Sequence, residues 1–388
     1  MSDQTDTYQV IIVGGGPVGL FLGYCLEHLG ISCIILEKRT ETITHSRSLG
    51  IHPVSLELFQ KLGLAAPFVE NGIKIFRGIA CNENGRLGSI SFKDEPLPFN
   101  FILSIPQFRT EELLEQKLNE RNSNILHRGA TLIDIEQQSD GVFATYKKNG
   151  KKYQLNGKFI VGCDGKNSKV RQLAEIDFEG SMYPDTYMMG DFTDNTDFGN
   201  DAVVYLHKKG LIESFPLPGK MRRWVVKTDT YISDPTKQSI VKLVAERTNH
   251  DLREQKNVMI STFGVQKLMA DPLFKNRVIL AGDAAHIVSP IGGQGMNLGW
   301  VNSWFLAKKF KQLFDGKVDR KTMLRNYASE AKKNTRKVVY RSEINMKLGR
   351  KKQLPVLRNA LAWFMLNTPL RKVMAKLFTM RKLDKWPI

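Results

Sequence analysis

Cysteine pairs and metal-binding patterns are missing from this 388-residue sequence. Its four cysteines form no CxxC pair and no metal-ligand spacing, and its histidines are scattered in the same way. These absences argue against a thiol redox motif or a zinc site, and we predict no metal and no chemistry for the cysteines. Most of them stand in apolar contexts, where a buried thiol is the simpler interpretation: Cys25, Cys33, Cys81 and Cys163.

Long apolar runs are also missing. The longest run near the C-terminus, Leu361–Leu366, is far shorter than the roughly 20 residues that a membrane-spanning helix requires. The first seven residues are polar and show no secretory signal pattern. We therefore expect a cytoplasmic protein.

Acidic residues are scarce in only one part of the chain. The net charge is +18, and residues 301–388 hold 23 Lys and Arg against 5 Asp and Glu, which leaves 34 of each sign in residues 1–300. The positive charge is thus a property of the C-terminal segment. No base-reading module accompanies it, so we predict no nucleic-acid partner.

A glycine-rich turn between two apolar runs stands near the N-terminus. Residues 10–13 have the pattern of a buried strand, Gly14, Gly16 and Gly19 follow, and the second apolar run ends at Glu37. These glycines allow a tight turn, a close approach of the backbone to a pyrophosphate and close packing of a helix on a sheet. The helix start offers amide groups to the phosphates, and an acid at this distance can bind a ribose diol. The unit predicts FAD or NAD, because the acid repels a 2′-phosphate.

The strand and helix patterns predict an α/β fold. A Rossmann-like cofactor domain is assembled from discontinuous segments, a β-sheet lobe is built from the pieces between them, and helices follow at the C-terminus. The cofactor domain comprises residues 1–75, 105–180 and 266–330, the lobe comprises residues 76–104 and 181–265, and the basic C-terminal helices comprise residues 331–388.

Two further motifs follow apolar strand patterns. The strand at residues 159–163 leads into Asp164-Gly165, and Arg171 follows on a nascent helix. Taken alone, Asp164 could simply cap that helix. The strand at residues 277–281 leads into Gly282-Asp283, where a carboxylate is well placed to hold the polyol of a riboflavin chain. A glycine loop at residues 289–297 then opens a helix, whose positive end points at whatever anion lies there.

In this order, the three motifs resemble those of the FAD-dependent monooxygenases of the para-hydroxybenzoate hydroxylase type, the single-component aromatic hydroxylases. The resemblance extends over at least residues 8–330. Arg47 and Gln107 match more loosely than the motif residues, and Arg47 could equally be a solvated loop charge. The resemblance implies that FAD is bound by Gly14, Gly16, Gly19, Glu37, Lys38, Arg47, Gln107, Asp164, Arg171, Gly282, Asp283, Gly295, Met296 and Asn297.

The chemistry that this resemblance implies belongs to the flavin. NAD(P)H binds transiently and reduces it, dioxygen adds to it, and the flavin hydroperoxide delivers one oxygen atom to an electron-rich substrate. The amides of the turn at residues 292–297 would stabilise the negative charge of the reduced ring. Pro290 would make the loop rigid beside the ring. We therefore name Pro290, Gly293 and Gly295 as the catalytic positions. The sequence does not indicate whether NADH or NADPH is used.

Substrate contacts are expected from the β-rich lobe, on the side that faces the flavin. The candidates are Tyr205, Phe215, Arg222 and Trp224, and the alternative for each is packing within the sheet. The resemblance implies hydroxylation of an aromatic, quinone-like or polyketide-like small molecule. An FAD-dependent reductase of an isoprenoid lipid, of the geranylgeranyl reductase kind, is the alternative function. A flavin-binding module without enzymatic activity is a third.

The basic C-terminal segment has two interpretations. Apolar residues recur at helical spacing, first at Leu357, Leu361 and Phe364 and then from Leu370 to Phe378, with basic residues beside them. These helices could pack against the flavin domain. They could also form an interfacial patch, in which Lys and Arg meet anionic lipid at the inner face of the membrane while Trp363, Phe378 and Trp386 dip into it.

Overall fold

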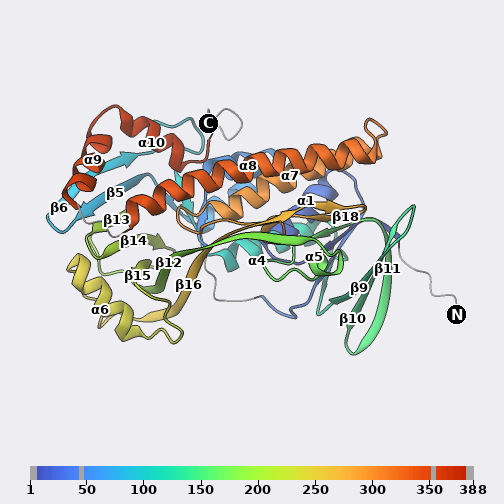
Figure 1. Cartoon of the computed structure of the whole chain (residues 1–388), viewed down its shortest axis with the longest axis horizontal. Coiled ribbons are helices and arrows are strands. Elements are labelled where there is room, and N and C mark those ends of the chain that lie inside the picture. The colour runs from blue at the N-terminus through green and yellow to red at the C-terminus, as the bar shows by residue number, and fades with distance from the viewer. Residues whose placement is uncertain (1–6, 43–47, 351–354, 382–388) are drawn as a thin grey trace.

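Strand β1 (Thr7–Val13) lies at the centre of a sheet that is buried on both faces. The computed structural model describes residues 7–42, 48–350 and 355–381. It pairs β1 in parallel with β2 (Cys33–Glu37) on one side and with β11 (Lys151–Gly162) on the other. Val10, Ile11 and Ile12 are fully buried, as expected for the central strand of a sheet that is covered by other elements (Figure 1).

The remaining strands of this sheet extend it in both directions. In parallel, β18 (Val278–Leu280) pairs with β11, and β8 (Leu126–Arg128) pairs with β2. The short β17 (Phe274–Lys275) closes one edge, and the hairpin of β9 (Thr131–Gln137) and β10 (Val142–Lys148) pairs with the first half of β11. Because β1, β2, β11 and β18 are parallel, their carboxyl ends meet at one edge of the sheet.

Helices far apart in the sequence cover this sheet together. Aromatic rings of three helices interlock, with ring centroids 4.9 Å apart for Phe59 and Trp300 and 5.3 Å apart for Phe21 and Phe59. The indole nitrogen of Trp300 also donates a hydrogen bond of 2.9 Å to the carbonyl of Pro17. The helices are α1 (Pro17–His28), α2 (Pro53–Lys61), α3 (Ala65–Asn71), α4 (Gln107–Arg121), α5 (Lys169–Leu173), α7 (Gln294–Phe314) and α8 (Arg320–Gly349).

A second sheet forms the β-rich lobe. Helix α6 (Lys237–Thr248) packs on one of its faces, and the other face packs against Ile291 and against Met346 of α8. The strand order is β19 (His286–Ile287), β16 (Asn257–Asp271), β12 (Asp177–Thr193), β15 (Met221–Thr228), β14 (Gly210–Leu217), β13 (Ala202–His207), β5 (Arg77–Asn82) and β6 (Gly85–Ser91). A small third sheet contains β3 (Gly50–Ile51), β7 (Ile102–Ser104) and β4 (Ile73–Ile75).

Long elements run across several of the segment boundaries expected from the sequence. Strand β12 begins at Asp177 and β16 continues to Asp271, so this antiparallel pair passes the expected boundaries at 180 and 265. Helix α8 likewise runs without a break through residue 330. The pattern of a strand does not change where it passes from one lobe to the next, so sequence periodicity cannot locate such a boundary.

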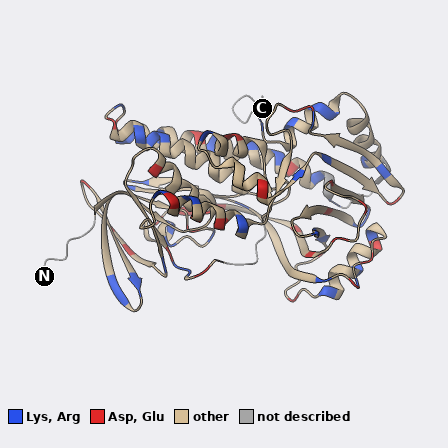
Figure 2. Cartoon of the chain, turned by 180° about the vertical axis from the view of Figure 1, so that it is seen from behind, with Lys and Arg blue, Asp and Glu red and all other residues tan. Residues whose placement is uncertain are grey.

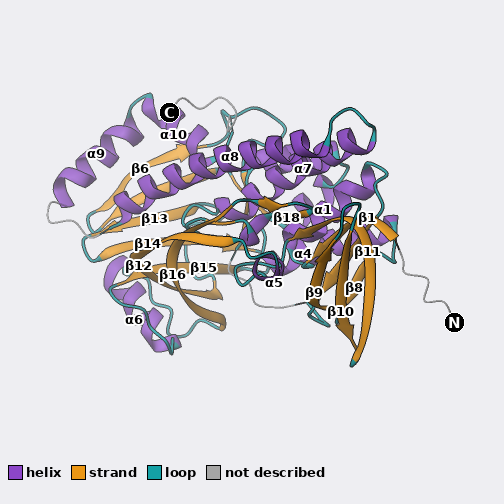
Figure 3. Cartoon of the chain, turned by 45° about the vertical axis from the view of Figure 1, so that its right-hand side comes forward, coloured by secondary structure: helices purple, strands orange, loops and turns teal. Residues whose placement is uncertain are grey.

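Two further helices, α9 (Pro355–Asn367) and α10 (Leu370–Phe378), lie at the end of the molecule opposite the β9–β10 hairpin (Figure 3). The amide of Asn367 donates a hydrogen bond of 2.9 Å to Leu87 of β6. Just beyond α10, Arg381 donates hydrogen bonds to Glu57 of α2 at 3.0 Å and to the carbonyl of Phe99 at 3.0 Å. The C-terminal helices therefore pack on both lobes. No helix within the described residues is long and apolar enough to cross a membrane.

Candidate functional site

The three sequence motifs meet at the carboxyl edge of the parallel sheet. The amide of Gly14 donates to Leu36 at 2.8 Å, that of Cys163 to Val13 at 2.7 Å, and that of Ala281 to Gly162 at 2.9 Å. Each loop is thus hydrogen-bonded to the strand beside its own. This edge, just beyond the strand ends, is where open α/β sheets bind their ligands.

Two glycines allow this close approach. Gly14 has φ +107°, and a Cβ there would lie 2.4 Å from the carbonyl oxygen of Cys163. A Cβ on Gly19 would lie 1.9 Å from the carbonyl oxygen of Gly14. No side chain larger than hydrogen fits either place without moving the backbone.

Gly16 is different, because a Cβ there would meet no protein atom within 4 Å. It is the N-cap residue of α1, no side chain caps the helix, and the first turn contains no acid. The first amide groups of α1 therefore face open space with the positive end of the helix dipole behind them. This arrangement fits a pyrophosphate.

Glu37 is buried and held by its neighbours. Its carboxylate accepts hydrogen bonds from the Gly15 amide at 2.5 Å and from the amide and guanidinium of Arg39, each at 2.9 Å. Burial raises the pKa of this carboxyl, but the hydrogen bonds from Arg39 and Gly15 outweigh it, and the net pKa is lowered. Glu37 is therefore ionised at neutral pH and keeps lone pairs for a ribose diol.

Gln107 belongs to the same network as Glu37. Its amide donates a hydrogen bond of 2.8 Å to Glu111, and Glu111 lies 3.6 Å from the guanidinium of Arg39. Arg39 therefore connects Glu37 to α4. The sequence analysis missed Arg39 and Glu111. The only signal for Arg39 was its position two residues after the acid that ends β2.

Asp164 and Arg171 act as braces between loops. Asp164 accepts hydrogen bonds from the Ser168 hydroxyl at 2.5 Å and from the Lys169 amide at 2.7 Å, so it caps α5. Arg171 is buried and donates to the carbonyls of Ala284 at 3.1 Å and Lys166 at 2.8 Å. Both side chains are thus engaged within the protein, which favours the capping interpretation of Asp164.

Asp283, unlike Asp164 and Arg171, is not held by neighbouring groups of the described chain. Its carboxylate has no hydrogen-bond or ionic partner among the residues that the structure describes. The side chain is accessible to solvent, yet the surrounding protein desolvates it enough to raise its pKa to about 6. The Asp283 carboxylate thus has free lone pairs. Its role in holding the polyol stays a prediction.

The turn that opens α7 is held from within. Gly292 and Gly293 have φ +90° and +65°, and Gly293 is the N-cap of α7. The buried Asn297 side chain donates to the carbonyls of Gly50 and Gly293, both at 2.9 Å, and accepts from the His52 amide at 2.9 Å. The side chain of Asn297 therefore shapes the turn.

The His52 ring joins this turn to the C-terminal helices. Its Nδ1 lies 2.7 Å from the carbonyl oxygen of Phe378, and its Nε2 lies 3.1 Å from that of Gly292. Burial lowers the pKa of His52 to about 4, so the ring is neutral at physiological pH and donates only one of these hydrogen bonds. No role was predicted for His52, because its partners Gly292, Asn297 and Phe378 are all 240 or more positions away.

The other predicted positions around the turn differ in exposure. Lys38 and Pro290 are exposed, Gly295 and Met296 are half-buried, and Gly282 has φ +57° and lies against Val18. Arg47 lies outside the described residues.

Three of the four predicted substrate residues point away from this turn, which corrects the expectation that they face the flavin. Tyr205 and Trp224 belong to the hydrophobic cluster between the second sheet and α6. Arg222 is fully buried on the same face and donates to Asp194 at 2.9 Å and to the carbonyl of Gly199 at 2.7 Å. Alternate residues of a strand face opposite sides, and the sequence pattern did not reveal which side faces the cofactor domain.

Phe215 lies on the opposite face, in the cluster that contains Ile291. Strand alternation places Glu213 on this face too, between Leu211 and Phe215 along β14 and beside Val204 and Val225 on the neighbouring strands. Glu213 is half-buried and has no hydrogen-bond or ionic partner among the described residues. Burial alone raises its pKa to about 7.

Tyr187, in a neighbouring position on this face, has a buried hydroxyl that finds no hydrogen-bond partner in the part of the chain that the structure describes. The face that packs against the Ile291 loop is therefore apolar and carries an unpaired carboxyl and an unpaired hydroxyl. The sequence analysis missed both residues. A single acid within an apolar strand was the available signal for Glu213.

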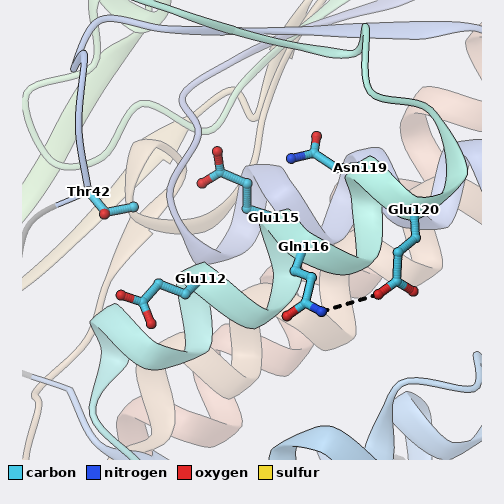
Figure 4. A pocket seen from close by; sticks show the side chains of 6 residues that line it. All are labelled: Thr42, Glu112, Glu115, Gln116, Asn119 and Glu120. Atoms are coloured by element: carbon cyan, nitrogen blue, oxygen red, sulfur yellow. Dashed lines mark hydrogen bonds between the residues drawn. The ribbon is translucent and has the colours of Figure 1, made fainter.

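A separate open pocket lies along α4 (Figure 4). Its acidic side chains would repel the phosphates of a dinucleotide, so it does not resemble a cofactor site. It is lined by Thr42, Glu112, Glu115, Gln116, Asn119 and Glu120. Within residues 7–42, 48–350 and 355–381, no group of His, Cys, Asp and Glu is arranged to hold a metal ion.

The open helix start at Gly16, the ionised Glu37 and the available Asp283 fit the pyrophosphate, ribose and polyol parts of FAD. The fold and this edge thus define a two-lobed α/β protein that binds a dinucleotide. A family model described as FAD binding domain matches residues 7–342, and the chain belongs to this FAD-binding family.

Comparisons with individual proteins agree with this assignment. The chain is 31% identical over 321 residues to a rifampicin monooxygenase of Streptomyces venezuelae, which covers 80% of this chain and 65% of that protein. It is 28% identical to the solved anhydrotetracycline hydroxylase OxyS of Streptomyces rimosus, with a TM-score of 0.81 and coverage of 98% and 77%. The chain spans about 60 to 65% of the length of the curated relatives compared first.

A third comparison concerns the fold alone. The p-nitrophenol 4-monooxygenase PnpA of Pseudomonas putida is 19% identical, with a TM-score of 0.87 over 99% of this chain and 100% of that one. The arrangement of the two sheets and the C-terminal helices is therefore shared with a protein of very different sequence.

Two glycine substitutions should separate folding from cofactor binding. Gly16→Ala adds a methyl group that meets no protein atom, so the free energy of unfolding of the apoprotein should change by less than about 0.5 kcal/mol while FAD binds at least tenfold more weakly. Gly19→Ala should both destabilise the apoprotein and abolish FAD binding. Denaturant unfolding and FAD fluorescence titration measure the two effects. Unchanged FAD affinity in Gly16→Ala would contradict the placement of the pyrophosphate.

Replacing Asp283 by Asn should make the apoprotein more stable at neutral pH and weaken FAD binding. The pKa of Asp283 in the folded protein lies above its unfolded value, so the ionised carboxyl costs stability above about pH 6, and the cost disappears as the pH falls toward about 4. The apo variant should therefore be more stable than the wild type at neutral pH and equally stable near pH 4, and it should bind FAD more weakly. Thermal unfolding across pH tests this, and a less stable variant at neutral pH would refute it.

Proposed function

We propose that this protein is an NAD(P)H-dependent FAD monooxygenase that hydroxylates an aromatic, quinone-like or polyketide-like small molecule with dioxygen. The observation that carries the proposal is the sheet face around Glu213. This face packs against Ile291, in the loop that leads into the Gly292–Gly293 turn. The names of two relatives, a rifampicin monooxygenase and an anhydrotetracycline hydroxylase, support it. We also propose a cytoplasmic location, where reduced nicotinamide is available.

The residues have distinct tasks in this proposal. Bound FAD supplies reduction by NAD(P)H and activation of dioxygen. The start of α1, Glu37 and Asp283 would hold the cofactor. The Gly293 amide donates to the carbonyl of Pro290 at 2.9 Å, so the free amides at the start of α7 would stabilise negative charge on the ring. Phe215, Val225 and their neighbours exclude water from the reacting substrate.

Glu213 accepts the proton of a ring hydroxyl in this proposal. The substrate O–H bond breaks, the proton moves to the Glu213 carboxylate, and the electron pair stays on the substrate oxygen, which makes the ring more electron-rich. A carboxyl with a pKa near 7 is suited to this task at neutral pH. An unpaired carboxyl is a poor neighbour for a pure hydrocarbon, so Glu213 favours a phenol over the isoprenoid lipid of the alternative reductase function.

Oxygen consumption tests the proposed function. The purified holoprotein should consume dioxygen with NADH or NADPH, and one member of a panel of phenols, quinones and tetracyclines should accelerate this consumption and gain one oxygen atom by mass spectrometry. Flavin reduction without any acceleration or mass gain across the panel would contradict the proposal. Reduction of an isoprenoid double bond without oxygen uptake would support the alternative.

Glu213→Gln should lower the rate of hydroxylation by about 10²-fold or more below the pKa of the substrate hydroxyl, because an amide cannot accept the proton. The loss should shrink at higher pH, where the substrate ionises by itself. In the wild type, the rate should rise with pH through about 7. FAD content should remain unchanged. Glu246→Gln, at a partly exposed glutamate of α6, is the matched control. A parallel pH profile in both variants would rule out this role.

A further inference from the structure

Helix α9 turns an apolar side toward solvent. The residues it buries against the second sheet are Arg358, Ala362 and Leu366, which recur every four positions. On the other side, Leu357, Leu361, Trp363 and Phe364 have exposed fractions of 68%, 50%, 55% and 51%. The apolar spacing that suggested a packed stripe in the sequence thus belongs to the solvent side of this helix.

Helix α10 extends this exposed region. Leu370 and Val373 have exposed fractions of 44% and 47%, while Ala375 is buried. We call the six residues Leu357, Leu361, Trp363, Phe364, Leu370 and Val373 the outer face. They make up half of the twelve large apolar side chains that are exposed in the described chain, within a span of 17 residues. Such a concentration marks an interaction site rather than ordinary surface.

The charges around the outer face have one sign. Arg371, Lys372 and Lys376 on α10 are exposed, and the sequence contains no Asp or Glu between Glu343 and Asp384. All three belong to α10, because Arg358, the one basic residue of α9, is buried against the second sheet. Figure 2 shows Lys and Arg of the chain in blue and Asp and Glu in red. Two contacts fix this surface to the rest of the protein: that of Phe378 at the end of α10 with His52, and that of Arg381, just beyond α10, with Glu57.

This combination identifies the class of partner. In an isologous contact with a second copy, this basic surface would meet itself, and like charges would repel. The core of a protein interface is also generally depleted in Lys. Exposed Leu, Trp and Phe beside Lys and Arg, on helices that lie along the surface, are typical of helices at a lipid interface.

We propose that the outer face of α9 and α10 binds the surface of an anionic lipid bilayer. The apolar side chains enter the boundary between headgroups and acyl chains, and the lysines and arginine contact the lipid phosphates. The two helices lie on the membrane and do not span it. This binding is independent of the hydroxylation proposed above.

Co-sedimentation of the full-length holoprotein with vesicles tests the proposal. It should bind vesicles containing phosphatidylglycerol at least tenfold more tightly than vesicles of phosphatidylcholine alone, and high salt should weaken the binding. Leu361→Glu with Phe364→Glu should reduce the binding at least tenfold. Tyr231→Glu with Val258→Glu, which adds the same charge at exposed apolar residues of the β-rich lobe, should bind like the wild type.

A second readout does not depend on the folding of the double variant. Anionic vesicles should shift the tryptophan emission of the wild type to shorter wavelength. The Trp363→Phe variant should lose most of this shift and should still sediment with the vesicles. The proposal is overturned if the wild type does not sediment with anionic vesicles, if it binds neutral vesicles equally well, or if both double variants bind alike. Because vesicle binding needs no substrate, a failure here is distinct from a failure of the proposed activity.

Discussion

The contact of Gly14 with the backbone of Cys163 is the constraint on which the rest of the site depends. The backbones at the ends of β1 and β11 approach so closely that no side chain fits between them at Gly14. Gly19 allows α1 to approach the same turn equally closely. Segments that are more than a hundred residues apart in the sequence thereby share one sheet edge. The open helix start at Gly16 and the carboxyl of Asp283 lie at this shared edge, where we propose that FAD binds.

The two halves of the site are built in different ways. At the cofactor edge, backbone groups fix the loops together with side chains such as Arg171 and Asn297, which hydrogen-bond to backbone carbonyls. These side chains are therefore occupied within the protein. On the second sheet, one face is filled by α6 and the other packs against the loop at Ile291. His52 ties the cofactor turn to α10, so the C-terminal helices are part of the same structural unit.

The cofactor edge was predictable from the sequence, because each motif there is local. A strand pattern, glycines at fixed offsets and a carboxylate appear within a few dozen residues, as at Gly14 to Glu37. The proposed substrate face was not predictable, since it depends on which side of β14 and β15 meets the cofactor domain. The aromatic side chains of Tyr205 and Trp224 indicated burial, but the alternation of side chains along their strands places them on the face covered by α6. For Glu213, the only local signal was its apolar neighbours.

The sequence also could not decide the roles of individual motif residues. Asp164 and Arg171 match a cofactor motif, yet their polar atoms are occupied by Ser168, Ala284 and Lys166. Long-range partners such as Phe378 for His52 leave no trace in sequence spacing. The basic C-terminal helices were predicted as amphipathic. Only the structure shows that the apolar stripe of α9 faces solvent, whereas Met374 and Phe378 of α10 pack against the protein.

The most direct test of the central claim is the fate of dioxygen. The holoprotein would be supplied with NADPH or NADH, the substrate found in the panel and dioxygen labelled with the heavy oxygen isotope, and the product would be analysed by mass spectrometry. The account predicts one labelled oxygen atom in each product molecule. A product with unlabelled oxygen, or label found only in hydrogen peroxide and water, would contradict it.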